Sequence, residues 1–212
     1  MNKYIRLLTI VTIFCFSSSG YTHDLKTAIS SKERTPSYVL RDSYRNPYET
    51  LTFFEIKPDM KVVELSPGGG WYTEILANYL HEPGLLIAAH FDKNSDRAYF
   101  KNSRAAYEKK IAEKPMYDNV YIVDLSSELA SEGSVDAVLT FRNLHNWLGP
   151  QIDLIFANSY KALKPGGIFG VVEHRANSGT SMDAMKKSGY VTEEHAIMVA
   201  KKHGFTLVAS SE

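Results

Sequence analysis

Residues 61–70 read KVVELSPGGG, and the expected architecture follows from this stretch. Its first five residues are a short, largely apolar run with two β-branched positions, which is typical of a buried strand. The three glycines predict a strand-to-helix turn in which backbone approaches a ligand closely, although a turn that binds nothing is also compatible with them. Because the loop lacks the Lys-Ser/Thr pair of a phosphate-cradling loop and the GxGxxG spacing, we exclude a nucleoside triphosphatase and disfavour a nicotinamide oxidoreductase.

Outward from this loop, apolar runs alternate with helical patterns. The runs predicted as strands are 61–65, 85–91, 119–125, 135–141, 166–174 and 205–210. The helical patterns cover 71–80, 94–114, 151–163 and 192–203. Short strands separated by helices need crossover connections, so the pattern predicts an α/β, Rossmann-like, doubly wound fold with a mostly parallel sheet and helices on both faces. No repeat or linker divides residues 38–212, which we expect to form one domain.

Composition narrows the class of protein. The 212 residues carry 24 Lys+Arg and 24 Asp+Glu, and this zero net charge gives no electrostatic reason to expect nucleic acid as a partner. The single cysteine excludes a disulfide framework and a cysteine-rich zinc site within the chain. Seven scattered histidines without an HExxH motif predict no metal site. The mixed charges of residues 97–114, Arg104 among them, indicate a solvated helix face.

The N-terminus has the layout of a secretory signal peptide. Lys3 and Arg6 precede an apolar run over residues 7–16 and a tail of small residues that ends at Gly20. The run is too short to cross a membrane, which takes about 20 apolar residues. We therefore predict cleavage of residues 1–20 and a periplasmic, bacterial protein. A buried N-terminal helix and an uncleaved anchor are the alternatives.

Polar and helical segments separate the predicted signal peptide from the first strand. Residues 21–37 are rich in polar side chains and are predicted to be a polar linker or a surface arm ahead of the domain. Residues 37–54 have a helical pattern that Pro47 interrupts, with Asn46 as the expected N-cap of the second helix.

Four motifs, in this order along the chain, resemble the class I S-adenosylmethionine-dependent methyltransferases. They are ELSPGGGWYTEIL (64–76), VDAVLTFRNLHNW (135–147), SYKALKPGGIFGVVEHR (159–175) and GYVTEEHAIMVAKKHGF (189–205). The similarity runs from about residue 57 to residue 210, and it extends in particular to a group of uncharacterised predicted methyltransferases with an export signal. The resemblance implies S-adenosylmethionine as the cofactor. The family's usual seventh strand has no counterpart in this sequence, so we expect an exposed sheet edge.

The resemblance assigns the first loop to the methionine part of the cofactor. In this sequence that role falls on Glu64, Ser66, Gly68 and Gly70. Ser66 stands where the family commonly has its first glycine, and because a serine prefers ordinary backbone angles, we expect a slightly shifted loop. The alternative for Glu64 is a strand-end acid that merely caps neighbouring amides.

Polar residues at the ends of the second and third strands are candidates for the ribose and the adenine. The family's ribose-binding acid would fall on His90, and the nearest acid, Asp92, follows two residues later. Either Asp92 reaches back or the ribose contact differs; alternatively, His90 is a satisfied polar residue and Asp92 an N-cap. Asp124 matches the residue that contacts the adenine amino group, with a turn-forming role as its alternative.

Beyond the fourth predicted strand, His145 and Asn143 are the candidate catalytic residues. Methyl transfer from a sulfonium requires an aligned acceptor and sometimes the removal of its proton. The unperturbed pKa of a histidine lies near neutrality, so His145 is the candidate base, and Asn143 with Arg142 would orient a polar acceptor. Packing at the strand end is the alternative for His145. Residues 173–175 either line the same crevice or form a solvated loop.

Two functional classes remain from the sequence. The first is an S-adenosylmethionine-dependent methyltransferase that acts on a small-molecule or cell-envelope acceptor. The second is a non-catalytic adenosyl-ligand-binding or assembly module on the same fold, since a fold does not fix a function. Export favours the second class to a degree, because S-adenosylmethionine is made in the cytoplasm. We expect neither a nucleic-acid partner nor an integral membrane span.

Overall fold

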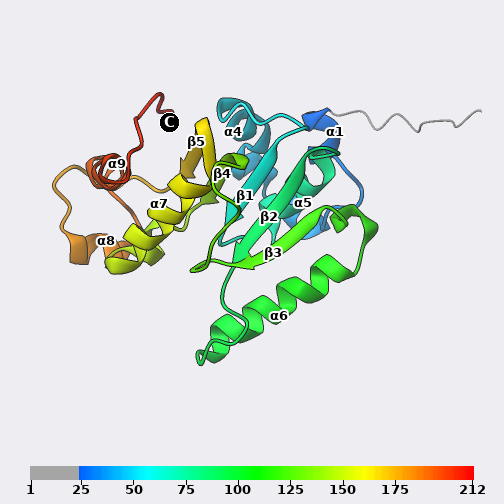
Figure 1. The fold of residues 1–212 in the computed structure, drawn as a ribbon, viewed down its shortest axis with the longest axis horizontal. Helices are drawn as coiled ribbons and strands as arrows, with labels where there is room; N and C mark the ends of the chain where they lie inside the picture. Colours follow the sequence, from blue (N-terminus) through cyan, green and yellow to red (C-terminus); the bar gives the residue numbers. More distant parts are fainter. Residues whose placement is uncertain (1–23) are drawn as a thin grey trace, which may run out of the picture.

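Five strands form one parallel sheet in the order β3-β2-β1-β4-β5 (Figure 1). The computed structural model describes residues 24–212, so the predicted signal peptide, residues 1–20, lies outside the described residues. The strands are β1 (Lys61–Leu65), β2 (Leu85–His90), β3 (Val120–Asp124), β4 (Val135–Phe141) and β5 (Leu163–Val172). All four strand pairings are parallel, which confirms the predicted α/β sheet.

Helices cover both faces of this sheet, as predicted. They are α1 (Leu25–Ile29), α2 (Pro36–Val39), α3 (Asp42–Arg45), α4 (Pro47–Phe53), α5 (Trp71–Tyr79), α6 (Ala98–Ala112), α7 (Pro150–Ala162), α8 (Met182–Ser188) and α9 (Glu193–Lys202), with 3-10 turns η1 (Pro115–Tyr117) and η2 (Leu144–Trp147). One apolar cluster, with Leu51 and Ile75, lies beneath α4 and α5, and a second, with Ile155 and Phe156, lies beneath α7 (Figure 1). Within residues 24–212, no helix is long and apolar enough to span a membrane.

The register of the central strand, β1, determines where its neighbours end relative to it. β1 lies between β2 and β4, and its apolar side chains are fully buried. Its last residue, Leu65, is paired with Ala89 of β2 and with Thr140 of β4. The segments that follow these three strands therefore begin side by side at one edge of the sheet, where ligands bind in folds of this type.

Residues 24–37 pack on the domain, whereas the sequence predicted a polar linker over 21–37. Helix α1 buries Leu25 and Ala28 in the core. The Arg34 side chain is buried and forms an ion pair with Asp42, with 2.7 Å between nitrogen and oxygen. The polar composition was misleading because these charged groups find partners within the fold. We refer to residues 24–46 as the N-terminal arm.

The N-terminal arm also contacts the loop after β1. The N–H and the hydroxyl of Thr35 donate to the buried carboxylate of Glu74, at 2.9 and 2.6 Å. The Tyr38 hydroxyl donates to the Gly69 carbonyl at 2.9 Å, and the Trp71 indole N–H donates to the Tyr38 carbonyl at 2.9 Å. The arm is thereby fixed to the end of the turn that joins β1 to α5 and to the start of α5.

The break between α3 and α4 differs in detail from the prediction. Pro47 begins α4 as expected, because its missing N–H costs nothing at a first helical position. Asn46 makes no side-chain capping bond to α4 and has a left-handed backbone with φ of 43°. Its N–H donates to the Asp42 carbonyl at 2.8 Å, so Asn46 ends α3 and also stands at the predicted N-cap position of α4.

Residues 205–210 belong to no strand, so the predicted sixth strand is wrong. The Phe205 ring packs near Phe169 of β5, with 4.9 Å between centroids, which keeps the tail beside the sheet. Leu207 and Val208 are 52% and 92% exposed, and no backbone ladder joins the tail to β5. An apolar run forms a strand only where it pairs with neighbouring backbone, and residues 205–210 make no ladder with the edge that β5 leaves free in the sheet of the described residues.

The contacts of Glu74 with the N-terminal arm predict a contribution to the free energy of unfolding. We expect Glu74→Ala to lower the free energy of unfolding by about 2–4 kcal/mol, because it removes a buried acceptor and leaves the half-buried Thr35 donors and Lys110 without this partner. Glu128→Ala is the matched control, since Glu128 pairs with Lys161 at 3.1 Å on the surface and should contribute less than about 0.5 kcal/mol. Equal effects of the two variants in denaturant titrations would contradict an anchoring role for Glu74.

Candidate active site

The loop after β1 takes a left-handed backbone at alternate residues. Ser66, Gly68 and Gly70 have φ values of 51°, 60° and 84°. The expectation that Ser66 keeps ordinary angles is wrong, although this conformation costs a non-glycine residue about 1–2 kcal/mol. The Ser66 N–H donates to the Ala89 carbonyl at 2.8 Å, which holds the loop against β2. The Ser66 hydroxyl is buried without a hydrogen-bond partner and is available to a ligand.

The two predicted cofactor-binding glycines differ in their surroundings. Gly68 is exposed, and a Cβ added there would meet no atom within 4 Å. Gly70 is buried, and a Cβ there would lie 3.1 Å from the Tyr107 ring and 3.3 Å from the Thr73 hydroxyl. Gly68 therefore leaves open space for a ligand, whereas Gly70 permits close packing of α5 against α6.

The Glu64 carboxyl lies beneath the loop rather than in the open crevice. It is 2% exposed and accepts a hydrogen bond from the Thr73 hydroxyl at 2.6 Å. Burial raises the pKa of Glu64 to about 7, against the lowering effects of the Thr73 hydrogen bond and of the Lys110 and Arg45 charges. The structure therefore gives Glu64 a supporting position behind the turn.

His90 holds the same loop from the side of β2. Its Nδ1 accepts the N–H of Phe91 at 2.8 Å, so the proton of the neutral ring is on Nε2, which donates to the Gly68 carbonyl at 3.2 Å. Burial lowers the pKa of His90, and the nearby Arg104 charge acts in the same direction. A neutral histidine with both nitrogens engaged positions Gly68 through its carbonyl.

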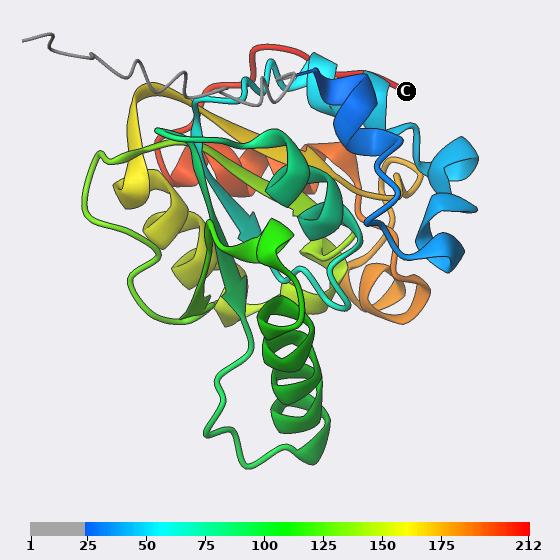
Figure 2. The same ribbon diagram turned by 90° about the vertical axis from the view of Figure 1, so that its right-hand side faces the viewer.

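Asp92 lies in the segment that joins β2 to α6, and Figure 2 shows this segment extending away from the sheet with the first turns of α6. The Asp92 carboxylate is exposed and accepts the N–H of Asn94 at 2.8 Å. Its hydrogen bond is local and shapes the turn. The structure does not show Asp92 reaching back to the end of β2.

Asp124 ends β3 beside His90 and is held by an arginine that the sequence did not single out. Arg104 donates to Asp124 Oδ1 at 2.8 Å and to the Phe91 carbonyl at 2.9 Å, and its Nε pairs with Glu108 at 2.8 Å. Arg104 is buried, so it does not belong to a solvated helix face. The Oδ2 atom of Asp124 accepts no hydrogen bond from the described residues and remains available to a ligand.

Asn143 connects the ends of β1 and β4. Its amide nitrogen lies 3.3 Å from the Leu65 carbonyl oxygen and 3.2 Å from the carbonyl oxygens of Ser66 and Phe141. The two hydrogens of this amide are shared among these acceptors. The structure thus places Asn143 as a brace for the loop after β1, while its Oδ1 faces no protein donor among the described residues.

His145 and Glu173 form a pair at the ends of β4 and β5. A carboxylate can only accept, so His145 Nδ1 carries the proton and donates to Glu173 Oε2 at 3.0 Å. The same oxygen accepts the His145 N–H at 3.2 Å, and Oε1 accepts the His174 N–H at 2.9 Å. The second imidazole nitrogen, Nε2, is left as a proton acceptor. The sequence left Glu173 either at the crevice or in a solvated loop, and it could not pair Glu173 with a residue 28 positions earlier.

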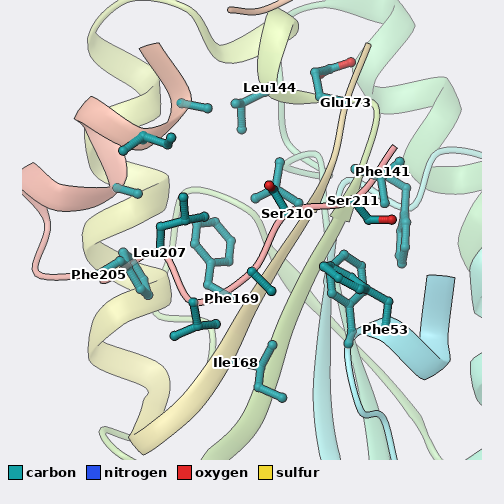
Figure 3. Close-up of a pocket in the computed structure, with 18 of the residues that line it drawn as sticks. Phe53, Phe141, Leu144, Ile168, Phe169, Glu173, Phe205, Leu207, Ser210 and Ser211 are labelled. Carbon is teal, nitrogen blue, oxygen red and sulfur yellow. The ribbon is translucent and has the colours of Figure 1, made fainter. Parts of the chain in front are cut away.

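A cavity of about 1360 Å³ opens on the β4–β5 side of these strand ends. Phe141, Leu144 and Glu173 line one end of it, and Phe169 lies further along β5 (Figure 3). None of residues 66–70 lines this cavity. The cavity over β4 and β5 is therefore separate from the open surface at Gly68. Within residues 24–212, no group of three or more His, Cys, Asp or Glu side chains could hold a metal ion.

Because the Glu64 carboxyl is buried, we predict that the stability of the fold decreases as pH rises. Its pKa is raised from 4.5 to about 7 in the folded protein, so the folded state binds more protons between these values. Stability from this group is complete below pH about 4.5 and is lost as pH rises through about 7, by about 3 kcal/mol. Denaturant unfolding at several pH values should show this loss in the wild type and not in Glu64→Gln. Parallel pH profiles would contradict it.

The comparison with known sequences yields one curated relative. The chain is 30% identical over 135 residues to an uncharacterized methyltransferase, sll0829, of Synechocystis. The match covers 62% of this chain and 54% of the relative, so the chain spans about half the length of the protein that it matches. No family model matches the chain.

Several solved structures with the same fold are methyltransferases, and a [4+2]-cyclase, SpnF, also shares it with a TM-score of 0.60 at 16% identity, covering 78% of this chain and 58% of that one. A SAM-dependent methyltransferase from Aquifex aeolicus superposes with a TM-score of 0.61 at 16% identity, covering 85% of this chain and 88% of that one. Phosphoethanolamine N-methyltransferase 2 of Haemonchus contortus, in complex with S-adenosyl-L-methionine, gives 0.57 at 18% identity, covering 76% and 37%. The strand order, the loop after β1 and these similarities together show that the chain has the fold of the class I S-adenosylmethionine-dependent methyltransferases.

Proposed function

We propose that this protein transfers a methyl group from S-adenosylmethionine to a small-molecule or cell-envelope acceptor. The observation that carries the proposal is the loop after β1, with its alternate left-handed residues and the open space above Gly68. This loop lies where strand order reverses between β1 and β4, the position at which open parallel sheets bind ligands. The sequence similarity to one methyltransferase and the shared fold support the same activity.

The residues at the ends of β1–β3 fit the cofactor. A side chain at position 68 would fill the space above the loop, and the buried Ser66 hydroxyl lacks a partner that a polar ligand would supply. The free Oδ2 of Asp124 offers an acceptor for a ligand amino or hydroxyl group. We assign direct contacts to Ser66, Gly68 and Asp124, with Glu64, Gly70 and His90 holding the loop in place. Bound there, S-adenosylmethionine supplies an electrophilic methyl group on a sulfonium centre.

His145 is suited to remove the proton of the acceptor. With Nδ1–H directed to Glu173, Nε2 is the basic nitrogen and would take the proton that an acceptor hydroxyl or amine loses on methylation, with the thioether S-adenosylhomocysteine as the second product. The imidazolium that results is stabilised by the Glu173 carboxylate, whose side chain is 8% exposed. Glu173 is thus a positioning residue that fixes both the tautomer and the orientation of His145.

Gly68→Val tests the cofactor site. The valine side chain should fill the space above the loop and abolish binding of S-adenosylhomocysteine, measured by calorimetry. Gly133→Val is the matched control, because Gly133 has φ of 61° and equally open surroundings but precedes β4, at the opposite edge of the sheet. Both variants carry a similar backbone strain, so only the loss of space distinguishes them. Normal binding by Gly68→Val would refute the loop assignment.

The His145–Glu173 pair predicts a loss of turnover without loss of cofactor binding. His145→Ala should reduce methyl transfer to a panel of acceptors by about 100-fold or more, and Glu173→Gln by a smaller factor, because general base catalysis contributes this much. His203→Ala is the control, since His203 forms a comparable pair with Asp153, at 2.7 Å, between α7 and α9. An unchanged rate in His145→Ala would assign His145 to packing. Cofactor binding without turnover in the wild type would favour the non-catalytic module.

A further inference from the structure

The cavity over β4 and β5 is distinct from the space above Gly68. Its lining includes Glu173, the partner of His145, but neither His145 itself nor any of Ser66, His90 and Asp124. Most of the cavity wall lies on the β4–β5 side of the strand-order reversal, and Arg45 and Tyr72 line it from the side of the loop after β1. Under the proposed function, the cavity is the part of the crevice open to the methyl acceptor.

Unpaired arginines gather at the end of this cavity. Arg45, at the end of α3, and Arg142, directly after β4, both line it. Among the described residues, neither of them nor the neighbouring Arg41 makes an ion pair, whereas three other arginines do: Arg34, Arg104 and Arg175. The cavity end thus carries positive charge that no protein carboxylate balances.

Arg45 is held in place without an anionic partner. Its guanidinium carbon lies 4.8 Å from the centroid of the Trp71 ring, and its Nε is buried with no hydrogen-bond partner. Burial lowers the pKa of Arg45, and the charges of Arg41 and Arg142 lower it further. A half-buried cation beside two like charges is destabilised, and a bound anion would offset that cost.

The carboxylates around this end of the cavity are engaged elsewhere or remain apart from the arginines. Glu173 is held by His145, and Glu193 and Glu212 pair with Arg175. Glu49 also lines the cavity but makes no ion pair with either Arg45 or Arg142. Among the described residues, therefore, no ion pair neutralises Arg45 or Arg142.

Aromatic side chains form part of the cavity wall, although polar residues such as Lys161 and Lys164 and the tail residues 206–212 line it as well. The rings of Tyr72 and Phe141 stack with 3.5 Å between centroids, Phe169 of β5 continues this wall, and Phe53 of α4 lies across from it (Figure 3). The volume of about 1360 Å³ exceeds the roughly 300–1000 Å³ of ordinary small-molecule pockets. An elongated ligand with one charged end matches this combination of size, aromatic walls and terminal cations.

We propose that Arg45 and Arg142 bind the anionic head group, a phosphate or carboxylate, of a methyl acceptor whose apolar body lies along β5. The acceptor role rests on the proposed function, while the binding of an amphiphilic anion does not. Arginine suits this task because its planar guanidinium donates two parallel hydrogen bonds to such an oxyanion.

Octyl phosphate, kept below its micelle-forming concentration, is the probe, with octanol as its uncharged counterpart. We expect octyl phosphate to bind the full chain in calorimetry, and Arg45→Gln and Arg142→Gln each to weaken it about tenfold or more. Arg45→Lys should retain part of the affinity, and octanol should bind all variants alike. The matched control is Arg97→Gln, because Arg97 is also unpaired but lies over the Phe100 ring at the start of α6.

Binding of S-adenosylhomocysteine, measured on the same variants, separates the two proposals. Normal binding of S-adenosylhomocysteine by the arginine variants, together with weakened octyl phosphate binding, supports the anionic subsite. Loss of S-adenosylhomocysteine binding in Arg45→Gln or Arg142→Gln would assign that arginine to the cofactor and overturn the acceptor subsite. Equal weakening by Arg97→Gln, or no weakening at all, would also overturn it. Failure of the wild type to bind S-adenosylhomocysteine while it binds octyl phosphate would contradict only the methyltransferase proposal.

Discussion

The parallel pairing of β1 with both β2 and β4 is the constraint on which the whole site depends. Because the three strands end at one level, the segments after them begin beside one another, and strand order reverses at β1 and β4. The loop that contains Gly68 lies at this reversal, and the cavity lies beside it over β4 and β5. A slip of either pairing by one residue would move the loop away from its supports, because side chains alternate between the faces of a sheet.

Most polar side chains at this edge support backbone rather than face open space. His90 donates to the Gly68 carbonyl, and Asn143 bridges the carbonyls of Leu65 and Ser66. Glu64 supports the turn from beneath through Thr73. The loop keeps three left-handed residues because it is held from several sides, and a loop fixed in advance loses little entropy when a ligand binds.

Sequence patterns correctly predicted those elements that are determined by residues close together in the chain. The strands and most helices follow from apolar periodicity, and the loop after β1 from its glycines. The failures all depend on contacts between distant residues. The run 205–210 has strand composition but makes no ladder with β5, and the polar segment 24–37 is ordered by groups such as Glu74, 39 residues from Thr35. The left-handed Ser66, the buried Arg104 and the His145–Glu173 pair were equally hidden, because each is fixed by neighbours that only the fold brings together.

The contact of the N-terminal arm with the loop after β1 affects where the chain can be shortened for expression. A domain boundary drawn at residue 38, as composition suggests, would remove Thr35 and leave the Glu74 carboxylate without two of its donors. It would also place a new chain end beside Tyr38, whose hydroxyl and carbonyl join the arm to Gly69 and Trp71. A recombinant protein that begins at residue 38 would therefore lose contacts that support the loop after β1. Purification tags are better joined ahead of residue 24.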